Sequence, residues 1–79
     1  MVRVVYFASL RDRAGSASTE EVVPPGATAA SLWEAIRSRP AFQGVASRPG
    51  FAVNGAWAGP DAVLVDGDEL GLLPAVSGG

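Results

Sequence analysis

Apolar and polar positions alternate in several short segments of the chain, and this pattern predicts strands. Residues 2–7 are rich in β-branched and aromatic side chains. Both faces of this segment are largely apolar, which predicts a central strand covered on one side by a helix. Four further segments are predicted strands: 19–23, 51–53, 56–58 and 69–73. Between two of them, Asn54-Gly55 predicts a tight hairpin, because a type I′ turn needs positive φ at both central positions.

One amphipathic helix is predicted from about residue 29 to residue 39. Its apolar face has the spacing i, i+3, i+4 and i+7 and consists of Ala29, Leu32, Trp33 and Ile36. Thr28 stands at the expected N-cap position, although Ser31 and Glu34 form an alternative capping box three residues later. Pro40 ends the pattern, since proline is not tolerated in a helix interior. The helical spacing places Trp33 in the core.

The remaining segments are predicted to be irregular. Residues 11–18 are polar around a glycine and are interpreted as a loop, and residues 41–48 hold at most a short helical turn. No second helix of comparable length is predicted. Two strands, one helix and three returning strands fit a two-layer α+β sheet. A right-handed crossover would place the last strand beside the first and parallel to it. We therefore expect one domain over residues 1–74 and a functional tail over residues 75–79.

Composition excludes several classes of function. A chain of 79 residues has room for one small core, and it contains no cysteine and no histidine. Disulfides, thiolate metal sites and the usual general base are therefore absent, which argues against a self-sufficient enzyme. The net charge is -2, and the cations are six scattered arginines, which do not form a basic patch for nucleic acid. No apolar run reaches transmembrane length and no signal-peptide layout is present, so we expect a cytoplasmic protein without membrane or nucleic-acid partners.

The chain ends in Ser77-Gly78-Gly79, which is the main candidate for chemistry. Glycine has no Cβ, so two terminal glycines can enter a narrow slot that excludes other residues. A partner enzyme could adenylate the Gly79 carboxylate and pass the acyl group to a sulfur or nitrogen nucleophile. An incidental glycine-rich end is the alternative.

Other polar groups have a structural interpretation. Asp66, Asp68 and Glu69 are interpreted as turn chemistry rather than a cation site, because no twelve-residue loop supplies further oxygens. The charged pairs are interpreted as solvated faces: Glu20, Glu21, Arg37 and Arg39. The isolated glycines do not form a phosphate-binding loop.

Several segments in register along the whole chain carry a family resemblance. They are Tyr6-Phe7-Ala8-x-Leu10-Arg11, Thr28 with Leu32-Trp33-Glu34-Ala35, Val53-Asn54, Asp66-Gly67-Asp68-Glu69 and Leu73-Pro74-x-Val76-Ser77-Gly78-Gly79. With these segments the chain resembles the small, sulfur-carrying subunits of molybdopterin synthase, which are ubiquitin-like β-grasp proteins. Ala75 departs from the pattern, since the family often has a second proline there.

The resemblance implies a fold and a reaction cycle. The fold would be a β-grasp, with a mixed sheet of about five strands on one main helix. An E1-like adenylating enzyme would use ATP to activate the carboxylate of Gly79, the second residue of the reactive pair Gly78-Gly79. A sulfur donor of the cysteine desulfurase or rhodanese type would then supply the sulfur of a thiocarboxylate. The large synthase subunit would transfer that sulfur to a cyclic pyranopterin. The chain itself would bind no cofactor or metal and would be the noncatalytic subunit of a heterotetramer.

The resemblance also implies a set of residues that contact the large subunit. They are Phe7, Arg11, Trp57, Leu73, Pro74, Val76 and Ser77. Exposed aromatic residues around an arginine are typical of interface hot spots, although ordinary core packing is the alternative for each apolar residue. Three other functions stay open: a sister sulfur carrier for thiazole or transfer-RNA thiolation, a ubiquitin-like modifier that joins Gly79 to protein lysines, and a protein-interaction module with an incidental tail.

Overall fold

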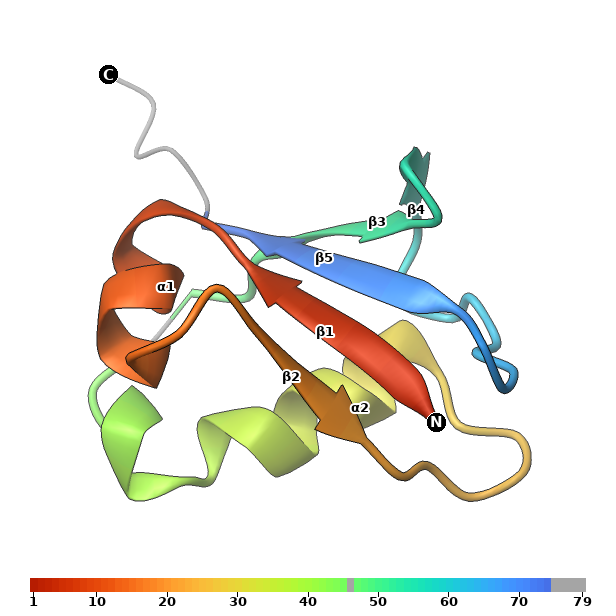
Figure 1. Ribbon diagram of the computed structural model, residues 1–79, viewed down its shortest axis with the longest axis horizontal. Coiled ribbons are helices and arrows are strands. Elements are labelled where there is room, and N and C mark those ends of the chain that lie inside the picture. The colour runs from red at the N-terminus through yellow and green to blue at the C-terminus, as the bar shows by residue number, and fades with distance from the viewer. Residues whose placement is uncertain (46, 75–79) are drawn as a thin grey trace.

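A mixed five-stranded sheet forms one layer of the protein (Figure 1). The computed structural model describes residues 1–45 and 47–74. The strands are β1 (Val2–Tyr6), β2 (Ser18–Glu21), β3 (Gly50–Val53), β4 (Ala56–Ala58) and β5 (Glu69–Leu73). Their order across the sheet is β2-β1-β5-β3-β4, in which β1 and β5 run parallel and the other neighbours run antiparallel. The predicted parallel pairing of the first and last strands is confirmed.

The main helix, α2 (Ala29–Arg37), packs on one face of this sheet (Figure 1). Thr28 is its N-cap, because the Thr28 hydroxyl accepts from the Ser31 backbone N–H at 3.1 Å. The Ser31 hydroxyl oxygen in turn accepts from the Thr28 backbone N–H at 2.8 Å. The capping box is therefore complete, with a serine at its third helical position where glutamate is more usual. The predicted Thr28 cap is confirmed, and the later start at Ser31 is excluded.

A second helix, α1 (Ala8–Ala14), includes the first half of the segment 11–18 that is interpreted above as a loop. That interpretation is wrong for two physical reasons. Leu10 is the one buried residue of α1, so the segment shows no helical period of apolar residues. Its N-cap, Phe7, offers no side-chain acceptor. Gly15 was the available signal, since its φ of 76° and its N–H bond to the Arg11 carbonyl (3.0 Å) make it the helix C-cap.

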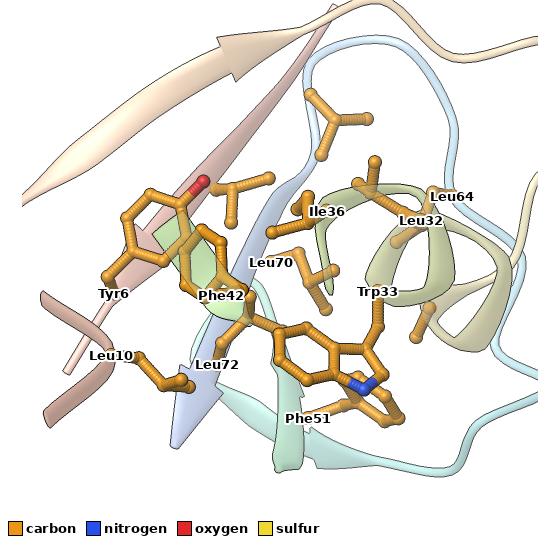
Figure 2. Close-up of a cluster of buried hydrophobic side chains, with 13 residues drawn as sticks. Tyr6, Leu10, Leu32, Trp33, Ile36, Phe42, Phe51, Leu64, Leu70 and Leu72 are labelled. Atoms are coloured by element: carbon orange, nitrogen blue, oxygen red, sulfur yellow. The ribbon is translucent and has the colours of Figure 1, made fainter. Parts of the chain in front are cut away.

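The core lies between α2 and the sheet face that α2 covers (Figure 2). Trp33 is 1% exposed, which confirms its predicted place in the core. Its ring makes an edge-to-face contact with Phe42, at 6.1 Å between centroids, and Phe42 also stacks on Tyr6 at 5.8 Å. Phe42 belongs to the short 3-10 helix η1 (Pro40–Phe42), in a segment whose sequence shows no clear pattern. This short turn after α2 therefore closes one end of the core.

A half-buried polar network joins β2 to Arg39, which lies between α2 and the short helix η1. Arg39 donates from two nitrogens to the two carboxylate oxygens of Glu21, at 2.6 and 3.1 Å. The Thr19 hydroxyl donates to Glu21 at 2.8 Å and lies 2.8 Å from the Tyr6 hydroxyl. The Glu21 side chain is only 13% exposed, so its interpretation as part of a solvated face is wrong. These hydrogen bonds, chiefly those from Arg39, lower the pKa of Glu21, although burial opposes the shift.

The other two members of that charged set form exposed pairs. Glu20 pairs with Arg3 at 3.1 Å, and Arg37 pairs with Glu34 at 2.9 Å within α2. Both pairs lie on solvated surfaces, as predicted, and such pairs contribute little to stability.

Substitution of Glu21 is expected to make the protein less stable at neutral pH. The pKa of Glu21 is lower in the folded chain than its ordinary value of 4.5. Its contribution is therefore fully present above that value and is lost as the pH falls through the folded pKa. Glu21→Gln should lower the free energy of unfolding by about 1–2 kcal/mol at neutral pH. The difference from wild type should shrink in acid, as measured by urea unfolding over a pH series. Glu20→Gln is the matched control, and equal losses in both variants would contradict the role of Glu21.

Candidate functional site: the outer face of the sheet

The sheet face opposite α2, called the outer face below, carries the candidate interface. Figure 1 shows α2 on one side of the sheet and α1 at its end, so the described helices leave this face open. Alternation along β5 buries Leu70 and Leu72 against α2 and places Gly71 and Leu73 on the outer face. The strand register aligns Trp57 with Ala52 and Ala52 with Gly71, so these residues form one row across three strands.

A hollow of about 270 Å³ lies on the outer face. Its lining consists of Phe7, Ala52, Gly55, Trp57, Glu69, Gly71 and Leu73. Phe7 is 44% exposed and Trp57 is 75% exposed, so two aromatic rings border the hollow while remaining open to solvent. Glu69 supplies the one charged side chain of the lining. Aromatic residues are enriched at protein interfaces, so the hollow is the candidate docking surface.

The hairpin that carries Trp57 is held in place by its own turn. Asn54 and Gly55 have φ values of 51° and 84°, which confirms the predicted positive φ at both positions. The Asn54 amide also donates to Asp68 at 3.0 Å, and its oxygen accepts from the Glu69 backbone N–H at 2.9 Å. These bonds attach the hairpin tip to the start of β5, so β4 and its tryptophan have a defined position relative to the central strand.

The acidic segment before β5 acts as a turn. Asp68 accepts from the Val65 backbone N–H at 2.9 Å as well as from Asn54, and Gly67 has a φ of 92°. The Val65 hydrogen bond, followed by that from Asn54, lowers the pKa of Asp68. The interpretation of this segment as turn chemistry is confirmed by these bonds. Over residues 1–45 and 47–74, no three histidine, cysteine, aspartate or glutamate side chains gather as a metal site would require.

The structure brings together three of the predicted interface residues and separates two others. Phe7, Trp57 and Leu73 line the hollow. Pro74 is half-buried and lines a different depression beside α1. Arg11 lies on the exposed side of α1 and faces a third depression. The remaining predicted residues lie outside the described part of the chain: Val76, Ser77, Gly78 and Gly79. Their roles, like the contacts expected of the other five, stay predictions.

Four lining residues were not anticipated from the sequence as parts of an interface: Ala52, Gly55, Glu69 and Gly71. Ala52 and Gly71 form the floor of the hollow, and Glu69 lies at its edge. A glycine inside a strand was the available signal, since it often marks a close approach of another group to the backbone.

Comparison with known proteins identifies the family. The model of the ThiS family matches residues 4–79 of the chain. The chain belongs to the ThiS family. A curated relative of this ThiS-family protein is the molybdopterin synthase sulfur carrier subunit of Chlamydomonas reinhardtii, at 35% identity over 99% of the chain and 98% of the relative. The resemblance inferred from the sequence motifs is confirmed.

Solved structures agree with this assignment and with the β-grasp fold. A putative molybdopterin converting factor subunit 1 from Pyrococcus furiosus is 32% identical, with a TM-score of 0.78 over 95% of this chain and 97% of that one. SAMP1 (small archaeal modifier protein 1) from Haloferax volcanii is 29% identical, with a TM-score of 0.81 over 99% and 98% of the two chains. Within the described residues of the ThiS-family protein, no helix combines the length and apolar character needed to cross a membrane.

Proposed function

We propose that this ThiS-family protein is the sulfur carrier subunit of a molybdopterin synthase and carries sulfur as a thiocarboxylate on Gly79. The observation that carries the proposal is the similarity to a curated sulfur carrier subunit of molybdopterin synthase along 99% of the chain. Gly78 and Gly79 lie within the segment that the ThiS family model matches.

The chemistry assigned to Gly79 needs no side chain of this protein. A carboxylate oxygen attacks the α-phosphorus of ATP on a partner enzyme, and pyrophosphate leaves. A persulfide sulfur of the donor then attacks the acyl carbon and displaces AMP. A second thiol then attacks the donor sulfur of this acyl disulfide and forms a disulfide with it, and the thiocarboxylate on Gly79 is the leaving group. The absence of cysteine and histidine from the sequence is compatible with this division of labour, because the reactive groups other than the terminus belong to partners.

The geometry of the last strand supports delivery of such a terminus into a partner. β5 is central in the sheet, and Leu73 at its end lines the outer hollow. Five extended residues after Pro74 can span at most about 17 Å, which is enough to reach an active site inside a partner whose surface contacts the domain. Ordering each of those residues costs about 1–2 kcal/mol, so contacts made by the domain itself must supply much of the binding energy. We assign those contacts to the outer hollow and its partner to the large synthase subunit.

Trp57→Ala is expected to weaken binding of the large subunit by about tenfold to a hundredfold, because buried tryptophans are frequent hot spots in interfaces. The exposed ring contributes little to the fold, so the melting temperature should change little. Isothermal titration with purified large subunit and thermal unfolding of the carrier alone measure the two quantities. Val22→Ala is a control at another exposed apolar residue, which is 80% exposed. Wild-type affinity in Trp57→Ala would contradict the assignment of the hollow.

The proposed sulfur chemistry is tested directly by intact mass. The protein should be incubated with the matching adenylating enzyme, ATP and a persulfide donor. Its mass should rise by the difference between sulfur and oxygen, and omission of ATP should prevent the change. An unchanged mass with an active enzyme set would contradict the proposal. Co-purification with a pterin-binding large subunit would separate this function from a sister carrier for thiazole or transfer-RNA thiolation.

Similarity to SAMP1 favours a second candidate function, a protein modifier that forms an amide between Gly79 and a lysine of another protein. The discriminating experiment is proteolysis of cellular protein followed by a search for branched Gly-Gly remnants on lysines. Remnants that disappear when this gene is deleted would support the modifier function. Absence of such remnants would favour the sulfur carrier function over the modifier function.

A further inference from the structure

Two strand glycines, Gly50 and Gly71, differ from the glycines of the turns. The turn glycines have positive φ, and an added Cβ would meet no atom within 4 Å: Gly15, Gly26, Gly44, Gly55 and Gly67. The backbone therefore explains glycine at those positions. Gly50 and Gly71 lie in β3 and β5 without positive φ, so any residue could adopt their backbone conformation. Glycine inside a strand is unfavourable, and another reason for its presence is needed.

That reason is an aromatic ring above each glycine. A Cβ on Gly71 would lie 3.3 Å from Cε2 of Phe7, and a Cβ on Gly50 would lie 3.0 Å from Cζ3 of Trp57. Both distances are shorter than ordinary van der Waals contact, so each ring rests directly on the backbone of a strand. Any larger residue would lift or rotate the ring. Both rings are substantially exposed and have room to move outward.

The positions of the rings decide the shape of the outer hollow. Phe7 and Trp57 border it, and Gly71 and Ala52 form its floor. The volume of about 270 Å³ is below the range of about 300–1,000 Å³ typical of small-molecule sites. It suits one large side chain. The lining is apolar apart from Glu69, whose carboxylate forms no ion pair with another residue of the described chain.

We infer that Gly71 and Gly50 are positioning residues that hold Phe7 and Trp57 against the sheet, and that the hollow thus formed receives one apolar side chain of the large synthase subunit next to a cation that pairs with Glu69. This inference rests on the proposed function. The identity of the partner follows from the position of Leu73, which lines the hollow and is followed by Pro74 and the tail. A protein that receives the tail therefore lies against this part of the sheet.

The test is Gly71→Ala, measured for both affinity and stability. The added methyl group displaces the Phe7 ring, so affinity for the purified large subunit should fall about tenfold. The melting temperature should stay the same or rise, because alanine reduces the conformational freedom of the unfolded chain and the exposed ring can yield. A merely structural role for the glycine would instead lower both quantities together. Gly59→Ala is the matched control, since a Cβ there meets no atom within 4 Å and φ is not positive.

A double-mutant cycle shows whether Gly71 acts through Phe7. In a Phe7→Ala background, Gly71→Ala should have no further effect on affinity, because no ring remains to be displaced. Likewise, Gly50→Ala should have no further effect on affinity in a Trp57→Ala background. The positioning role would be overturned if the glycine substitutions lowered the affinity for the large subunit as strongly in the Phe7→Ala and Trp57→Ala backgrounds as in the wild type. It would also be overturned if Gly71→Ala alone bound with wild-type affinity.

Substitutions in the lining of the hollow test whether a side chain of the large subunit enters it. Ala52→Leu places a larger side chain on the floor and should abolish binding while the domain still unfolds cooperatively. Glu69→Gln should weaken binding and reduce its dependence on salt concentration. Retained affinity in Ala52→Leu would overturn the inference that a partner side chain enters the hollow.

If the wild-type carrier shows the ATP-dependent mass increase but these variants bind normally, the inference fails while the proposed function stands. If the wild-type carrier shows neither the mass increase nor binding, the proposed function fails.

Discussion

Extension of the chain by one alanine after Gly79 is expected to abolish thiocarboxylate formation without changing the melting temperature. In the proposed reaction, the carboxylate of a terminal glycine enters a slot that excludes a Cβ, and the extension moves the carboxylate onto a residue with a side chain. The described core is complete by Leu72, so residues added after position 79 remove no core contact. Intact mass after incubation with adenylating enzyme, ATP and sulfur donor measures the product, and thermal unfolding measures stability.

The control for this experiment is the same alanine added before Met1. The N-terminal ammonium pairs with Asp66, but both groups are exposed, so their displacement should have little effect on stability. This variant should be thiocarboxylated at the wild-type rate. Normal thiocarboxylation of the C-terminal extension would show that Gly79 is not the acceptor, and a lower melting temperature would show that the end of the chain contributes to folding.

Trp33→Ala is expected to destabilise the domain severely. Trp33 is 1% exposed and packs among residues of α2, η1 and the sheet (Figure 2). Loss of such a side chain leaves a cavity and typically costs about 3–5 kcal/mol. A domain of this length has a total stability of about 4–12 kcal/mol, so the variant should be marginally folded or unfolded at room temperature. Urea unfolding followed by circular dichroism measures the change.

The chain contains a matched control for this substitution in its other tryptophan. Trp57→Ala removes the same side chain from a position that is 75% exposed, and its effect on the free energy of unfolding should be within about 0.5 kcal/mol. The two variants thus separate core packing from the docking surface. Similar destabilisation by both would contradict the placement of Trp57 on the outer face.

The predictions made from local patterns were accurate where the pattern itself contains the physical cause. The apolar spacing of Leu32, Trp33 and Ile36 predicted the face of α2 that is buried. Asn54-Gly55 predicted the hairpin because few other residue pairs adopt positive φ at both positions. One crossover helix predicted the parallel pairing of β1 and β5, because the handedness of such connections leaves few alternatives.

The errors occurred where the cause lies in distant parts of the chain. α1 has one buried residue, so its existence depends on packing at the end of the sheet rather than on an apolar period. Glu21 and Arg39 are 18 positions apart, and neither carries a local sign that the other will be its partner. Phe42 lies in a segment without pattern and reaches the core because Tyr6 and Trp33 are there to receive it.

The sequence alone determined the element types of the sheet and main helix, the family resemblance and the candidate terminus, because these depend on residue type and on spacing along the chain. Only the tertiary structure decided which residues form a surface together. Phe7, Ala52, Trp57 and Gly71 come from four strands or strand ends, and the register of the sheet alone brings them to one hollow. The close contacts of Phe7 with Gly71 and of Trp57 with Gly50 arise in the same way, since contact between side chains and backbone is a property of the folded arrangement.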